Sequence, residues 1–329
     1  MRGDPADRRI ERDKPVTTAA PHAHRLAVIL PCYNEEAAIT AVVRDFRAAL
    51  PQAVIYVYDN NSRDRTVELA RAAGAVVRHE TRQGKGQVVR RMFADVEADI
   101  YVLADGDGTY EAASAPAMVA KLIDERLDMV VGSRLTTYEG EAFRRGHRFG
   151  NDLLTGFLGL CFGRTFTDIL SGYRVFSRRY VKSFPALSTG FETETELSVH
   201  ALELRMPIAE VVTPYKARPA GSASKLRTYR DGFRILMMIL NLFKEERPLA
   251  FFSIIAGILG LAAVALAYPI VMTFLETGLV PRFPTAILST GLMILASLSL
   301  TCGFVLDTVT HGRREMKRLA YLSIPPTGN

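Results

Sequence analysis

Two aspartates separated by a glycine are the residues of this 329-residue sequence best suited to bind a metal ion. Asp105 and Asp107 follow the apolar run 100–104, which predicts a buried strand that ends in a turn. Carboxylate oxygens are hard ligands for Mg²⁺ or Mn²⁺, and such an ion takes its other ligands from water and substrate phosphates. We therefore predict that Asp105 and Asp107 bind a metal-bound diphosphate, with Asp107 catalytic and Gly106 in the same turn. For this short motif alone, an ordinary Asp-Gly turn is the alternative.

Strands and helices alternate through the first part of the chain. The apolar runs that predict strands are residues 26–30, 54–58, 75–78, 100–104, 128–131 and 208–213. Alternation with helical segments predicts βαβ units, and hence an α/β fold with a Rossmann-like, mostly parallel sheet. Ligands of such sheets bind at the carboxyl ends of the strands, where nearly all the polar motifs of this sequence fall.

The carboxyl-terminal third of the chain has very little charge. Leu249 to about Leu275 and Thr285 to Leu306 are each long enough to cross a hydrocarbon core of about 30 Å, with buried core helices as the alternative. Tyr229 to Phe243 predicts an amphipathic helix with basic flanks, suited either to an anionic membrane surface or to packing on the domain. Basic residues lie at the outer ends of both spans, so the positive-inside rule predicts that the catalytic domain and both termini are cytoplasmic.

Composition and these patterns predict the domain organisation. Three scattered cysteines argue against a disulfide framework or a zinc site and favour a reducing compartment. No nucleic-acid-binding motif and no secretory signal is recognisable. The expected segments are a disordered tail at 1–24, a catalytic domain at 25–225, an amphipathic interface helix at 226–247, a transmembrane hairpin at 248–309 and a cytoplasmic tail at 310–329.

Six motifs occur in a fixed order along the chain: Pro31-Cys32-Tyr33-Asn34-Glu35, Asp59-Asn60-Asn61-Ser62, Gly84-Lys85-Gly86, Asp105-Gly106-Asp107, Gly132-Ser133-Arg134 and Ser171-Gly172-Tyr173-Arg174. Over about residues 25–245 the chain resembles the family-2 glycosyltransferases of the GT-A fold. Within them it resembles the polyprenyl-phosphate glycosyltransferases, which include dolichol-phosphate mannose synthase and bacterial undecaprenyl-phosphate glucosyltransferases.

This resemblance implies metal-dependent transfer of a hexose from a nucleotide sugar to polyprenyl phosphate at the bacterial cytoplasmic membrane. UDP-glucose is the first expectation for the donor and GDP-mannose the second, while UDP-galactose and amino-sugar donors stay open. Undecaprenyl phosphate is the expected acceptor, and the bacterial relatives imply a homotetramer. We expect inversion at the anomeric carbon, because direct attack by phosphate needs no covalent enzyme intermediate.

The resemblance also assigns roles on the donor side. The residues implied to bind the nucleotide and its diphosphate are Pro31, Tyr33, Glu35, Asp59, Asn61, Lys85, Asp105 and Gly106. Lys85 lies between two glycines near a helix N-terminus, where a phosphate can approach the backbone. A solvated lysine is the alternative for Lys85, and a cap of its own turn is the alternative for Asp59. Thr109 stands where dolichol-phosphate mannose synthases tend to have Gln, which leaves a third protein ligand of the metal open.

The acceptor side needs cations more than a base. A phosphate monoester has a second pKa of about 6 and is largely dianionic near neutrality, so it attacks without a general base. The candidates for binding it are Arg134, Ser171, Arg174 and Lys225, and ordinary surface charge is the alternative for each cation. Asp168 matches a position proposed as a catalytic base in relatives, or it orients the acceptor. Three glutamates either line the same cleft or favour a helix N-terminus, namely Glu192, Glu194 and Glu196.

Three other functions share some of these features. A processive polysaccharide synthase would resemble its family in a Gln-x-x-Arg-Trp motif, and this chain contains no Trp and only two predicted spans. A non-catalytic membrane scaffold would not need the intact aspartate pair and nucleotide loop. A nucleotidyltransferase shares the sheet and the metal but has no need of a membrane hairpin.

Overall fold

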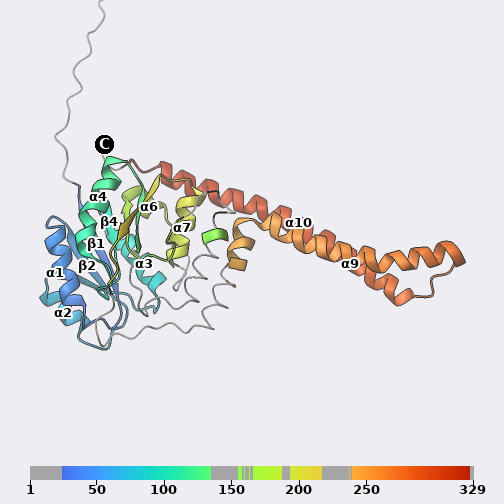
Figure 1. Ribbon diagram of the computed structural model, residues 1–329, viewed down its shortest axis with the longest axis horizontal. Helices are drawn as coiled ribbons and strands as arrows, with labels where there is room; N and C mark the ends of the chain where they lie inside the picture. Colours follow the sequence, from blue (N-terminus) through green and yellow to red (C-terminus); the bar gives the residue numbers. More distant parts are fainter. Residues whose placement is uncertain are drawn as a thin grey trace, which may run out of the picture.

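The computed structural model describes residues 24–134, 155–157, 159, 163, 166–186, 193–216, 237 and 239–326. Within these residues an α/β body carries two long helices that project from it as a pair (Figure 1). Lys225, Glu192, the 1–23 segment and most of the predicted amphipathic helix at 229–243 lie outside the described residues.

The described part of the body is built on a seven-stranded sheet with the order β3-β2-β1-β4-β6-β5-β7. Its strands are β1 (Leu26–Cys32), β2 (Val54–Asp59), β3 (Val76–His79), β4 (Ile100–Leu103), β5 (Met129–Arg134), β6 (Arg174–Ser177) and β7 (Ile208–Thr213). Strand β6 is antiparallel to both neighbours, and the other pairs are parallel. The six predicted strands and the mostly parallel sheet are confirmed, whereas β6 was not predicted.

Helices cover both faces of this sheet because alternate strand residues are apolar on both sides. Val28 and Leu30 lie in the core cluster beneath α1 (Ile39–Ala49) and α4 (Ala115–Asp124). Ala27 and Ile29 lie in the cluster on the opposite face. The helices of that second face are α3 (Lys85–Asp95), α6 (Arg178–Ser183) and α7 (Thr193–Glu203), and α2 (Thr66–Ala72) connects β2 to β3.

The two projecting helices are α9 (Pro248–Thr277) and α10 (Phe283–Leu322). Both are long and apolar enough to cross a membrane, and only 6% and 11% of the most apolar stretch of each helix is buried. Core helices of a soluble protein would be mostly buried, so that alternative does not describe them. The two helices pack on each other, and Ser289 donates through Oγ to the carbonyl oxygen of Ala263 at 2.8 Å.

Helix α10 extends well beyond its apolar part and returns to the α/β body (Figure 1). Lys317 Nζ lies 2.6 Å from Glu203 Oε2, at the end of α7. Nearer the end of α10, the Tyr321 hydroxyl donates to Asp128 Oδ2 at 2.7 Å, and Arg179 lies over the Tyr321 ring. Residues 310–322 of the expected carboxyl-terminal tail thus form the last part of α10, where polar side chains contact the body.

Candidate active site

The direction of β6 gathers the polar motifs at one edge of the sheet. The parallel strands β1, β2, β4 and β5 all end at this edge, and the antiparallel β6 begins there. Arg174, the first residue of β6, pairs with Leu103 at the end of β4 and with Val131 in β5. The loop that enters β6 therefore lies between the aspartate pair and Arg134.

The aspartate turn is fixed by contacts on both of its sides. Asp107 is 3% exposed, and its Oδ1 accepts hydrogen bonds from the backbone N and Oγ1 of Thr109 at 3.1 and 2.7 Å. Gly106 lies against the buried thiol of Cys32, so closely that a Cβ atom on it would be 2.3 Å from Sγ. Only glycine fits there without a displacement, and the turn is therefore tied directly to β1.

Lys85 lies between two carboxylates. Its Nζ is 2.5 Å from Asp105 Oδ1 and 2.5 Å from Glu194 Oε1, and its side chain is 15% exposed. Burial disfavours the ammonium ion, but attraction from Asp105 and Glu194 outweighs burial and raises the pKa of Lys85. Gly84, at φ +132°, allows the tight entry into α3 that brings Lys85 to this point. Lys85 is thus an ion-paired and mostly buried lysine, and the solvated-lysine alternative does not describe it.

The aspartate pair fits a magnesium-like ion that is bound mainly through its substrate. Asp105 is 28% exposed at the side chain and faces the β6 loop, where a Cβ atom on Gly172 would lie 2.9 Å from Asp105 Oδ2. Among the described residues, no group of three or more His, Cys, Asp or Glu side chains could hold a metal. Two carboxylates with water and phosphate oxygens are the usual ligand set of Mg²⁺.

The loops after β1 and β2 are held together by hydrogen bonds. Asn34 N donates to Ser62 Oγ at 2.9 Å, and Arg63 N donates to Asn34 Oδ1 at 2.8 Å. Glu35 N donates to Thr66 Oγ1 at 2.8 Å. The two loops therefore form one wall at the edge of the sheet.

This wall contains the residues expected to bind the nucleoside. Those that are partly exposed there are Pro31, Tyr33 and Glu35. Asp59 is 3% exposed, and its two carboxylate oxygens accept hydrogen bonds from Ser62 N at 3.2 and 3.3 Å. Asp59 therefore caps its own turn, as the alternative for this residue states. Asn61 donates to the carbonyl oxygen of Thr81 at 3.0 Å, so it supports the loop that leads to Lys85.

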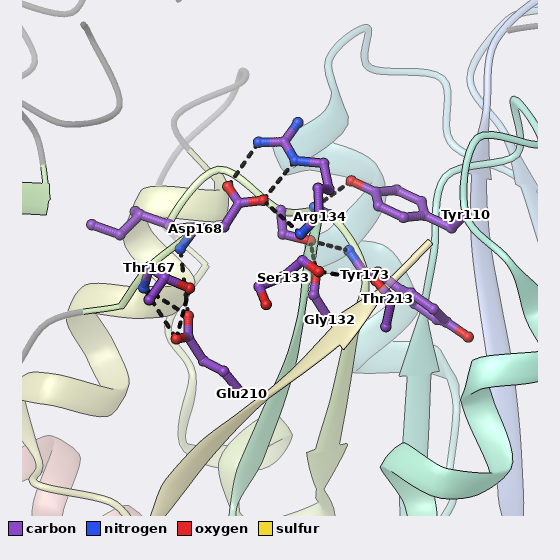
Figure 2. Close-up of polar contacts among 12 residues, drawn as sticks. Tyr110, Gly132, Ser133, Arg134, Thr167, Asp168, Tyr173, Glu210 and Thr213 are labelled. Carbon is purple, nitrogen blue, oxygen red and sulfur yellow. Dashed lines mark hydrogen bonds and ion pairs between the residues drawn. The ribbon is translucent and has the colours of Figure 1, made fainter. Parts of the chain in front are cut away.

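Arg134 and Asp168 form a bidentate ion pair beside the β6 loop (Figure 2). Arg134 Nε and Nη2 lie 2.6 and 2.7 Å from the two carboxylate oxygens of Asp168. Both side chains are mostly buried, with 16% and 11% exposed. Attraction from Asp168 outweighs the effect of burial and raises the pKa of Arg134. Because both of its oxygens are engaged, Asp168 is better placed to orient Arg134 than to accept a proton.

Two residues predicted to bind the acceptor are buried instead. Arg174 is 0% exposed, and its guanidinium donates to the carbonyl oxygens of Ser171, Ile169 and Glu194 at 2.9, 2.6 and 3.0 Å. Ser171 is also fully buried and donates through Oγ to the carbonyl oxygen of Gly132 at 2.6 Å. The expectation that Arg174 and Ser171 contact the acceptor is therefore corrected: both hold the β6 loop from below.

Tyr110 is a site residue that the sequence did not single out. Its hydroxyl accepts a hydrogen bond from Gly172 N at 2.8 Å, and its ring packs on Tyr173 and Tyr215. Burial and the nearby charge of Asp105 raise the pKa of Tyr110. Tyr110 links the aspartate turn to the β6 loop, and its position directly after Asp-Gly-Thr was the available signal.

Comparison with known proteins gives a consistent result. A sequence profile described as Glycosyl transferase family 2 matches residues 27–184. Glycosyltransferase AglJ of Haloferax volcanii is 32% identical over 304 residues, covering 92% of this chain and 99% of that protein. A dolichyl-phosphate hexose transferase of the same organism is 32% identical over 223 residues, covering 68% of this chain and 95% of that protein.

Solved structures agree on the fold. Glucosyl-3-phosphoglycerate synthase from Mycobacterium tuberculosis, in complex with Mn²⁺, UDP-glucose and phosphoglyceric acid, superposes with a TM-score of 0.54 and 25% identity. The superposition covers 66% of this chain and 79% of that chain.

Proposed function

Since the chain belongs to glycosyl transferase family 2, we propose that this glycosyltransferase moves a hexose from a nucleotide sugar to polyprenyl phosphate. UDP-glucose is the first choice of donor and GDP-mannose the second. The solved complex of glucosyl-3-phosphoglycerate synthase with Mn²⁺ and UDP-glucose supports a uridine nucleotide and a divalent metal. The name of the dolichyl-phosphate hexose transferase relative supports a polyprenyl phosphate acceptor.

One arrangement carries this proposal. The Asp105–Asp107 turn and the Arg134–Asp168 pair lie on either side of the β6 loop, in a body attached to two helices that could cross a membrane. Carboxylates suit the metal-bound diphosphate of the donor, and a guanidinium suits the phosphate of the acceptor. An active site with these two halves, held near a membrane, fits a phosphate carried by a lipid.

On the donor side, Asp105 and Asp107 would hold Mg²⁺ or Mn²⁺, which neutralises charge on the diphosphate leaving group. Lys85 keeps Asp105 in place through its 2.5 Å ion pair and adds positive charge beside the leaving group. Pro31, Tyr33 and Glu35, in the wall formed by the β1 and β2 loops, are proposed to contact the nucleoside.

On the acceptor side, Arg134 is proposed to bind the phosphate and Asp168 to orient the guanidinium. A dianionic phosphate oxygen attacks the anomeric carbon directly, so no side chain has to remove a proton. The reaction then proceeds with inversion. Lys225, which lies outside the described residues, stays a proposed second cation for the same phosphate.

We further propose that both termini and the catalytic body lie on the cytoplasmic side of a bacterial inner membrane. Basic residues at the outer ends of α9 and α10 support this orientation through the positive-inside rule. A homo-oligomer, with a tetramer as the first expectation, is part of the same proposal.

The test is a transfer assay with the full chain in liposomes. Undecaprenyl phosphate and Mn²⁺ are offered with radiolabelled nucleotide sugars, and Asp107→Asn is compared with Asp124→Asn, an exposed aspartate at the end of α4. We expect one donor to label the lipid, loss of labelling only in Asp107→Asn, and the opposite anomeric configuration in product and donor. Failure of every donor to label the lipid would refute the acceptor, and retained configuration would refute the direct attack.

A further inference from the structure

A glutamate on the edge strand β7 holds the segment that carries Asp168. Glu210 Oε1 and Oε2 accept hydrogen bonds from Thr167 N at 2.9 and 3.1 Å, and Oε2 also accepts from Thr167 Oγ1 at 2.9 Å. Asp168 N lies 3.4 Å from Glu210 Oε1. Figure 2 shows Glu210 below this segment and Arg134 above it, with Asp168 between them. The carboxylate of Glu210 therefore binds the backbone of Thr167 and Asp168, and Asp168 is the ion-pair partner of Arg134.

Arg134 and Glu210 lie on neighbouring strands, β5 and β7. Strand β7 is parallel to β5, with Glu210 opposite Val131 and Thr213 opposite Arg134. Thr213 Oγ1 donates to the carbonyl oxygen of Ser133 at 3.3 Å, which ties the end of β7 to the residue before Arg134. Since paired strands are rigid relative to each other, Glu210 has a fixed position with respect to the backbone of Arg134.

We propose that Glu210 is a positioning residue for the acceptor phosphate: by anchoring Thr167 and Asp168, it sets the direction in which Arg134 points. This inference rests on the proposed function, because it takes Arg134 as the group that binds the phosphate. A guanidinium reaches a phosphate through a planar fork, so a small rotation misaligns both hydrogen bonds. A segment that is free to shift would let Asp168 and Arg134 move together.

Three donors face the carboxylate of Glu210, namely two backbone N–H groups and the Thr167 hydroxyl. A glutamine would keep its oxygen for the two N–H groups and donate from its NH₂ group to the Thr167 hydroxyl, which also accepts hydrogen bonds. Glu210→Gln is therefore expected to keep most of the anchor and Glu210→Ala to lose it, whereas Glu210→Asp keeps two acceptor oxygens on a shorter side chain.

The experiment measures steady-state transfer by the full chain in liposomes, together with amide hydrogen exchange of the 166–173 segment. We expect Glu210→Ala to raise the KM for undecaprenyl phosphate about tenfold, as for the loss of one charge-assisted hydrogen bond, without changing the KM for the donor. Exchange of the segment should become faster, and Glu210→Asp should recover part of both effects. Glu125→Ala, which removes a surface partner of Lys121, is the matched control.

The outcomes separate the two proposals. If the wild-type chain labels no polyprenyl phosphate with any donor, the proposed function fails and this inference fails with it. If the wild-type chain is active and Glu210→Ala exchanges faster but keeps its acceptor KM, only the positioning role of Glu210 is overturned. Unchanged exchange in Glu210→Ala would overturn it as well, and so would an equal rise in the KM for donor and acceptor, because the effect would then not be confined to the acceptor.

Discussion

A methyl group added to Gly106 should disable the aspartate turn, and a second substitution should restore it. The Cβ atom of Gly106→Ala would lie 2.3 Å from Cys32 Sγ, whereas ordinary contacts begin at 3.4 Å. The turn or the thiol must then move by about 1 Å in a closely packed interior. Overpacking of this kind costs about 1–3 kcal/mol of unfolding free energy, and a shift of about 1 Å in a reacting group can cost about 100-fold in rate.

The restoring change is Cys32→Ala, which removes the sulfur atom. In the double variant, the nearest atoms to the new methyl group are the carbonyl oxygen of Pro31 at 3.5 Å and Cβ of residue 32 at 3.6 Å, both at ordinary contact distances. Cys32→Ala alone should lose about 1 kcal/mol, since it leaves only a small cavity. The double variant should therefore be more stable and more active than Gly106→Ala.

The assay combines thermal unfolding in detergent with the liposome transfer assay for all four chains. The coupling free energy between the two positions is expected to be about 1–2 kcal/mol in favour of the double variant. Additive losses, or a Gly106→Ala chain with wild-type activity, would refute the idea that the sulfur of Cys32 sets the position of the aspartate turn.

Three further predictions concern charge. Burial, with a smaller repulsion from a nearby lysine, lowers the pKa of His200 from 6.5 to about 3, so the fold requires neutral imidazole and loses stability as pH falls below 6.5. The loss between pH 7 and pH 5 is about 2 kcal/mol in urea unfolding and should be absent in His200→Gln but kept in His79→Gln, whose ring is 51% exposed. Lys85→Met leaves the two carboxylates that it bridges without a cation, and the free energy of unfolding should fall by about 3 kcal/mol; Mn²⁺ should restore part of it, and an unchanged melting temperature would contradict the bridge. Tyr321→Phe removes the hydrogen bond to Asp128 and should cost about 1.5 kcal/mol of unfolding free energy without altering the KM for the donor.

Most of the sheet could be predicted because its parallel strands are apolar runs that end in turn residues. Residues 26–30 and 100–104 are of this kind, and burial on both faces explains their uninterrupted apolar character. Strand β6 was missed because Arg-Val-Phe-Ser is short and begins with a charged residue. Its antiparallel direction, which brings the β6 loop to the site, has no local signal.

The sequence could place the aspartate pair and Arg134 at one edge of the sheet, because each follows a predicted strand and ligands of such sheets bind at the carboxyl ends of the strands. The prediction for Arg174 was wrong because an arginine is expected at the surface unless its N–H donors find hydrogen-bond acceptors inside the protein. Here three backbone carbonyls satisfy them, and these come from Ile169, Ser171 and Glu194. Such a set of acceptors depends on the tertiary fold, so spacing along the chain does not reveal it.

The length of α10 has a consequence for how the α/β body is held relative to the apolar hairpin. Its 40 residues span about 60 Å, roughly twice the thickness of a hydrocarbon core. One end of the helix packs on α9, and the other end contacts Glu203 and Asp128 of the body. The helix therefore fixes both the distance and the rotation of the body relative to the apolar hairpin. One residue inserted in its middle would turn the body by about 100° against the apolar hairpin, whereas seven residues would keep the phase and add about 10 Å. The distance of the candidate active site from the apolar hairpin and the direction that this site faces are therefore both set by one helix.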